Sequence, residues 1–214
     1  MTKFHSSTGA LVAAALLLAA CAGPSGEPAA GFVSREAERA YIPLHGTKYI
    51  VLTGDAAAVA LGDRIAVTNA HTANLLDERA VIGISHDYDL LFFHTDKPVA
   101  PLASEAPRQG ARVIAYGQYE RKLRRAEGTV TSLDAPVEPN CRGCIVQSAF
   151  TFTGNAGPGF SGGPVLDAET GKLMGIVFGY TDDAKGGRTI YAYPMQRVNA
   201  ELKKIEDALP VDPD

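Results

Sequence analysis

The sequence predicts an all-β protein, either a sandwich or a pair of barrels. Short apolar runs recur along residues 41–193, separated by Gly, Pro, Asn and Asp. A stretch with three prolines, Pro98–Pro107, divides these runs into two halves of about six strands each. The chain has few helical patterns and 46% hydrophobic residues, so its strands can share a sizeable core.

The first twenty residues are expected to be a signal peptide rather than part of the fold. Lys3 precedes an apolar run from Ala10 to Ala20, which is too short for an ordinary transmembrane helix. The run ends in Leu18-Ala19-Ala20-Cys21, which resembles the lipobox of bacterial lipoproteins, whose cysteine becomes the lipid-modified N-terminus. Ala22, in place of Asp, favours the outer membrane facing the periplasm. A plain signal peptide with a chance cysteine is the alternative.

Residues 21–40 are expected to connect this anchor to the domain. Residues 22–31 consist of small residues, prolines and one glutamate, a composition typical of a linker. Residues 32–40 can form a short helical turn. The folded domain is then expected to span residues 41–214.

The strands of the domain are predicted in two groups. In the first half, about 41–103, the runs are Lys48–Thr53, Ala57–Leu61, Arg64–Thr68, Ala80–Ile84 and Leu90–His94. In the second half, about 104–194, they are Arg112–Tyr116, Glu127–Leu133, Cys144–Phe152, Gly163–Asp167, Lys172–Phe178 and Thr189–Tyr193. Apolar residues at helical spacing predict a closing helix over residues 195–209.

A glycine-rich stretch from Gly157 to Val165 carries a serine, Ser161, between glycines. Such a turn can expose a hydroxyl beside outward-pointing N–H groups, which is the geometry an acyl-transfer nucleophile requires. A tight turn between two strands explains the same residues. The choice depends on whether the chain offers a base and an acid.

All the histidines of the chain precede Ser161: His5, His45, His71, His86 and His94. The α/β-hydrolase order, in which the histidine follows the serine, is therefore excluded. His71 directly follows a predicted strand and is the best base. Asp89 opens an apolar strand, where an orienting carboxylate would be buried. Asp87, two residues earlier, is the alternative acid.

Three segments in this order resemble the motifs of chymotrypsin-like serine proteases. Val67-Thr68-Asn69-Ala70-His71 is similar to their TAAH motif, and Asp89–Phe93 to their DIALL segment. Gly159–Pro164 is similar to their GDSGGP motif. Gly175-Ile176-Val177 resembles the start of the strand that lines their primary specificity pocket.

The resemblance implies two six-stranded antiparallel β-barrels with the active site between them. His71 would be the general base, Asp89 would orient it, and Ser161 would be the nucleophile. The N–H groups of Gly159 and Ser161 would form the oxyanion hole.

The sequence departs from the family pattern in two places. The interval between His71 and Asp89 is short, which implies a trimmed first barrel. Phe160 replaces the aspartate that pairs with a newly freed N-terminus in trypsin-like zymogens, so activation by that pairing is expected to be absent. The specificity pocket is assigned by the same resemblance to Asn155, Val177, Phe178, Gly179, Tyr180 and Thr189. No acid is among them, which favours a small or apolar substrate side chain over Arg or Lys.

The remaining cysteines, Cys141 and Cys144, are expected to form a small disulfide, because an exported protein lies where disulfides persist. A redox-active or zinc-binding pair is the alternative, but no second ligand pair with zinc spacing is present in the sequence. The net charge of −4 gives no basic field for nucleic acid. No metal or cofactor is required for this chemistry.

The leading hypothesis is therefore an exported, lipid-anchored serine endopeptidase that acts on polypeptides through an acyl-enzyme. Two alternatives are a catalytically silent binding protein with the same fold and a hydrolase of small esters that uses the same triad. The sequence gives no indication of oligomeric state.

Overall fold

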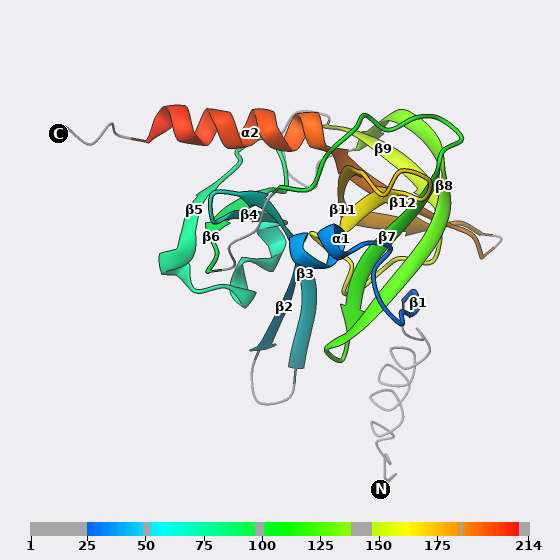
Figure 1. The fold of residues 1–214 in the computed structure, drawn as a ribbon, viewed down its shortest axis with the longest axis horizontal. Coiled ribbons are helices and arrows are strands. Elements are labelled where there is room, and N and C mark those ends of the chain that lie inside the picture. The colour runs from blue at the N-terminus through cyan, green and yellow to red at the C-terminus, as the bar shows by residue number, and fades with distance from the viewer. Residues whose placement is uncertain (1–24, 49–51, 97–100, 138–146, 185, 210–214) are drawn as a thin grey trace, which may run out of the picture.

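The computed structural model describes residues 25–48, 52–96, 101–137, 147–184 and 186–209. The strands in these ranges form two antiparallel sheets, side by side in Figure 1. The predicted all-β fold of two antiparallel β-barrel units with a C-terminal helix is confirmed, although the first unit has five strands rather than six in the described residues. Cys21, Cys141 and Cys144, with the predicted lipidation and disulfide, lie outside the described residues.

The first sheet has five strands in the described part of the chain, in the order β2–β3–β4–β6–β5. Their bounds are β2 Tyr41–Lys48, β3 Leu52–Gly62, β4 Ile65–Thr68, β5 Val81–Ile84 and β6 Leu91–His94. The prediction of a single strand over Lys48–Thr53 is wrong, because β2 ends and β3 begins within it. Gly54 and Asp55 resemble a turn in the sequence, but they lie inside β3 and pair with Gly46 and His45 of β2.

In the described residues, the second sheet closes into a barrel of six strands. Its order is β1–β8–β7–β10–β11–β12–β9, and β8 also pairs with β9. The bounds are β7 Arg112–Tyr119, β8 Lys122–Val137, β9 Gln147–Thr153, β10 Pro164–Asp167, β11 Leu173–Asp182 and β12 Arg188–Pro194. The short strand β1, Glu27–Pro28, is added to the outside of β8.

A shared core joins the two sheets. It combines side chains of the first sheet, such as Val67 and Phe92, with side chains of the second, such as Tyr116, Ile176 and Tyr193. These five side chains are less than 1% exposed. Gln118 of β7 adds a polar link, because its buried amide donates to the carbonyl oxygens of Leu44 and Ala56. These contacts fix the position of one sheet relative to the other at their junction.

Two helices cover this junction. Helix α1, Arg35–Ala40, is capped by Ser34, whose Oγ accepts from the N–H of Ala37 at 3.1 Å. Helix α2, Met195–Ala208, lies across both sheets at the top of Figure 1 and buries Val198 against the shared core. Neither of these helices is long and apolar enough to span a bilayer, and the same holds throughout the described residues.

Candidate active site

The loop that carries Ser161 runs between β9 and β10, at the junction of the two sheets. The carbonyl oxygen of Ser161 accepts from the N–H of Ala57 in β3 at 2.8 Å. The N–H of Gly162 donates to the carbonyl oxygen of Val177 in β11, also at 2.8 Å. The serine backbone is thus held from both sheets at once.

Gly159 shapes the backbone two residues before the serine. Its φ is +90°, and a Cβ there would lie 1.9 Å from the carbonyl oxygen of Gln118, so no other residue fits without displacing β7. The Gly159 carbonyl accepts from the N–H of Gln118 at 3.0 Å. Within the described residues, the N–H groups of Gly159 and Ser161 donate no hydrogen bond. Both donors are therefore available to an incoming oxygen.

The structure brings His71 and Asp89 to the same serine. His71 lies in a 3₁₀ turn, Ala70–Leu75, that directly follows β4, and Asp89 precedes β6, the neighbouring strand. The His71 Nε2 lies 3.0 Å from the Ser161 Oγ. The Asp89 Oδ2 lies 2.6 Å from the His71 Nδ1, and its Oδ1 accepts from the His71 N–H at 3.0 Å.

These contacts determine the tautomer of His71. An ionised carboxylate can only accept a hydrogen bond, so Nδ1 carries the proton that Asp89 binds. In the neutral ring, the lone pair of Nε2 then faces the Ser161 hydroxyl. The arrangement can take a proton from the serine and hold the resulting imidazolium beside a carboxylate.

Two buried side chains hold Asp89 through its backbone. Asn69, which is fully buried, donates from Nδ2 to the Asp89 carbonyl oxygen at 2.9 Å. The Tyr193 hydroxyl lies 3.4 Å from the Asp89 N–H. Burial raises the pKa of Tyr193, and the negative charge of Asp89 raises it further, so the phenol remains protonated at neutral pH. Phe178 stacks on the Tyr193 ring at 3.9 Å between centroids.

The alternative acid, Asp87, lies away from His71. Its Oδ2 is 3.2 Å from the Lys204 Nζ on α2, and its N–H donates to the Ser85 Oγ. The geometry therefore favours Asp89 over Asp87 as the partner of His71.

A pocket of about 360 Å³ opens beside His71 and Ser161. Of the residues predicted to line it, Val177, Phe178, Gly179 and Tyr180 do so. Ala156, Gly157 and Pro158 complete its wall. Among the residues that the structure describes, His71 is the one ionisable acid or base in the lining of this pocket apart from the Tyr180 phenol.

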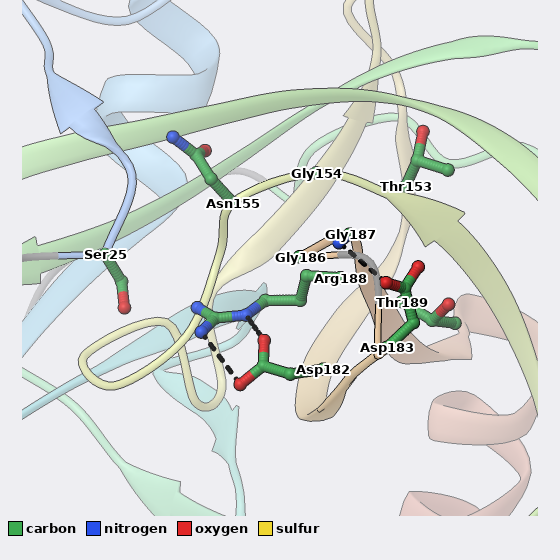
Figure 2. Close-up of a pocket in the computed structure, with 10 residues that line it drawn as sticks. All are labelled: Ser25, Thr153, Gly154, Asn155, Asp182, Asp183, Gly186, Gly187, Arg188 and Thr189. Carbon is green, nitrogen blue, oxygen red and sulfur yellow. Dashed lines mark hydrogen bonds and ion pairs between the residues drawn. The ribbon is translucent and has the colours of Figure 1, made fainter. Parts of the chain in front are cut away.

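Asn155 and Thr189 line a different pocket of about 500 Å³, drawn in Figure 2. Arg188 explains the separation, because its Nη1 donates to the Ala156 carbonyl oxygen at 3.0 Å and its Nε to Asp182 at 2.5 Å. Figure 2 shows the Asn155 side chain pointing away from Arg188. The structure therefore places Asn155 and Thr189 at this second pocket rather than among the residues that line the pocket beside Ser161.

Comparison with known proteins agrees with this geometry. A family model described as a trypsin-like peptidase domain matches residues 44–176, which include His71, Asp89 and Ser161. The chain belongs to the trypsin-like peptidase family. No curated protein matches its sequence.

Solved structures share the fold of this trypsin-like peptidase. The active form of the Rv3671c protease from M. tuberculosis has a TM-score of 0.65 at 18% identity, over 88% of this chain and 92% of that one. The MamO protease domain from Magnetospirillum magneticum has a TM-score of 0.59 at 18% identity, over 77% and 96%. AlgW, an HtrA-type protease solved with a decapeptide, has a TM-score of 0.63 at 15% identity, over 81% and 66%.

Sequence reasoning missed Asn69, Arg188 and Tyr193 as parts of the peptidase site. Asn69 lies inside the recognised motif. Its polar side chain directly follows an apolar strand, and this was the one feature of the sequence that could have indicated its role. Arg188 and Tyr193 lie at opposite ends of β12, in a segment that reads as an ordinary strand. Among the described residues, no cluster of histidine, cysteine and acidic side chains is suited to a metal ion.

Proposed function

We propose that the protein is a serine endopeptidase that uses Ser161, His71 and Asp89. One observation carries the proposal: a continuous chain of contacts, 2.6 Å from Asp89 to His71 and 3.0 Å from His71 to Ser161. Distances in this range allow direct proton transfer between the groups.

In the proposed reaction the Ser161 Oγ attacks the carbonyl carbon of the scissile peptide bond while His71 Nε2 takes its proton. The N–H groups of Gly159 and Ser161 stabilise the resulting oxyanion. His71 then gives the proton to the leaving amine as the C–N bond breaks, which leaves an acyl-Ser161. His71 Nε2 then deprotonates a water molecule, whose oxygen bonds to the acyl carbon. The ester bond to the Ser161 Oγ breaks, and His71 returns the proton to that oxygen.

The lining of the pocket supports a small or apolar residue before the cut. Pro158 and Phe178 present apolar surface, and the Arg188 guanidinium is engaged by Asp182 and the Ala156 carbonyl oxygen. A charged substrate side chain would lose hydration there without gaining a partner, which is unfavourable.

Export and anchoring are also proposed. The apolar run before Cys21 and the small residues at its end support a lipid on Cys21, with the domain outside the cytoplasm. In that compartment Cys141 and Cys144 would form a disulfide.

The proposal predicts that Ser161→Ala abolishes reaction with a fluorophosphonate probe and cleavage of peptides, because no nucleophile remains. His71→Ala should have the same effect, since the hydroxyl loses its base. Ser104→Ala is a matched control, because Ser104 is an exposed serine outside the site, and it should react at the normal rate.

Peptide cleavage by pure, folded Ser161→Ala would contradict the proposal. A folded native chain that does not react with the probe would instead favour a silent binding protein. Turnover of small esters without cleavage of any peptide would favour the esterase.

A further inference from the structure

The N-terminal segment Ser25–Ala29 is attached to the outside of the second barrel, although its composition is typical of a linker. Glu27 and Pro28 of this segment form β1, which pairs with β8 (Figure 1). The N–H of Ala29 donates to the Leu123 carbonyl oxygen at 3.2 Å. This segment therefore has a defined position, and that position is beside the loop that carries Ser161.

The segment contacts the loop at two points on its path toward the serine. The N–H of Gly26 donates to the Asn155 carbonyl oxygen at 2.8 Å. At Gly157, an added Cβ would lie 2.4 Å from the Ser25 Oγ, so the Ser25 side chain lies against the backbone of Gly157. Ser25 and Asn155 both line the pocket drawn in Figure 2.

A third contact involves Phe160, the neighbour of Ser161. The Phe160 ring is fully buried. An added Cβ at Gly26 would lie 2.5 Å from the Phe160 Cζ, and one at Gly117 of β7 would lie 2.6 Å from its Cγ. The ring is therefore held between β7 on one side and the N-terminal segment on the other.

Arg124 of β8 holds the segment in place. Its Nε donates to the Ser25 carbonyl oxygen at 3.2 Å, and its Nη2 donates to the Gly26 carbonyl oxygen at 2.5 Å. Hydrogen bonds from a charged donor are among the stronger polar contacts in proteins.

We infer that Ser25–Ala29 is a strap that holds the loop 155–161 in its catalytic conformation, and that Arg124 is a positioning residue that holds the strap. The loop contains Gly157 and Gly159, so it has many accessible conformations unless external contacts restrict them. The N–H groups of an oxyanion hole act only when their direction is fixed beforehand. Loosening the strap would reduce the fraction of molecules that are competent for reaction.

The test is Arg124→Ala in the full-length chain, followed by two measurements. Hydrogen exchange of the amides in 155–163 should become about tenfold faster, because the loop opens more often. Acylation by a fluorophosphonate should become about tenfold slower, a smaller loss than the roughly hundredfold cost of deleting an oxyanion donor. With a peptide substrate, kcat should fall more than KM rises.

Lys122→Ala is the matched control, because Lys122 is an exposed cation on the same hairpin and should leave both measurements unchanged. Arg124→Lys should restore part of the protection, since one charged donor returns. Gly26→Ala is an independent second variant, because its methyl group would enter the space of the Phe160 ring. It should have the same effect as Arg124→Ala.

If the hydrogen-exchange rates of the loop are unchanged in both Arg124→Ala and Gly26→Ala, the proposal that the strap holds the loop is contradicted. Faster loop exchange with an unchanged acylation rate would overturn its positioning role. The kinetic measurement rests on the proposed peptidase function, whereas the exchange measurement does not. A native chain that fails to react with the probe would therefore contradict that function. The hydrogen-exchange measurement would still test whether the strap holds the loop.

Discussion

Asp89 and Asp87 lie two residues apart, but their carboxylates face different partners. Asp89 contacts His71, and Asp87 contacts Lys204 of α2. Asp89→Asn should lower kcat by about 10³- to 10⁴-fold, because an amide donor facing Nδ1 favours the wrong tautomer of His71. Asp87→Asn is the matched control and should change kcat by less than about threefold.

Steady-state cleavage of one peptide by both folded variants measures this difference. A greater loss in Asp87→Asn than in Asp89→Asn would exclude Asp89 as the orienting acid.

Asp167 illustrates a residue that matters for stability rather than chemistry. Its side chain is 1% exposed and accepts from Arg108 Nη2 at 2.6 Å and from the N–H groups of Glu169 and Thr170 at 2.7 and 2.9 Å. Burial alone would raise the pKa of this carboxyl, but the hydrogen bonds from Thr170, Glu169 and Arg108 outweigh it, and the pKa is lowered.

The direction of this shift gives a pH dependence. Because the folded pKa lies below the unfolded one, Asp167 stabilises the fold above about pH 4, and this stabilisation is lost as the pH falls through the folded pKa. Asp167→Asn should lower the free energy of unfolding by about 1–3 kcal/mol at pH 7. Urea unfolding at several pH values should show the difference from the native chain shrinking below pH 4.

Asp207→Asn, at an exposed position, serves as the control and should show little difference at either pH. A difference for Asp167→Asn that is equal at pH 3 and pH 7 would show that its charge has no role.

At the scale of elements, α2 connects the second barrel back to the first through Glu201. This carboxylate is 2% exposed and accepts from the Ser85 Oγ at 2.8 Å and the Lys204 Nζ at 2.7 Å. The Ser85 Oγ in turn accepts from the N–H of Tyr88, the residue before Asp89. The position of α2 therefore affects the segment that carries Asp89.

Glu201→Ala should lower the free energy of unfolding by about 1–3 kcal/mol, because the buried Ser85 hydroxyl loses its acceptor. Glu201→Gln should cost less, since its amide oxygen can still accept. Lys203→Ala is the matched control on the same helix, and loss of its exposed pair with Asp207 should cost no more than about 0.5 kcal/mol. Chemical unfolding compares the three variants. Equal stability of Glu201→Ala and Lys203→Ala would contradict this role.

The elements that the sequence predicted well are those with a local signature. The closing helix has one apolar face, and β10 to β12 are apolar runs between turn residues, so each could be predicted from its own residues. The boundary between β2 and β3 was missed because the end of β2 and the start of β3 both fall inside one apolar run, while Gly54 and Asp55 stand within a strand. Turn residues alone did not distinguish a chain reversal from a point within a strand.

At the scale of the whole molecule, the relation between the barrels depends on contacts that no local pattern contains. The motifs around His71, Asp89 and Ser161 each occupy a few consecutive residues, so their order could be read directly. The lining of the pocket depends on Arg188, which lies 32 residues from the carbonyl group of Ala156 that it binds. The N-terminal strap depends on Arg124, about a hundred residues away, and its composition of small residues and proline equally suits a free linker.

If the proposed lipid on Cys21 is present, the docking of β1 would limit how far the domain can stand from a bilayer. If Cys21 carries a lipid as proposed, four residue steps separate it from Ser25, a reach of at most about 14 Å. Ser25 in turn contacts Gly157 in the wall of the substrate pocket. The substrate pocket would then remain close to the lipid headgroups. Its substrates would be polypeptides that lie at the membrane surface.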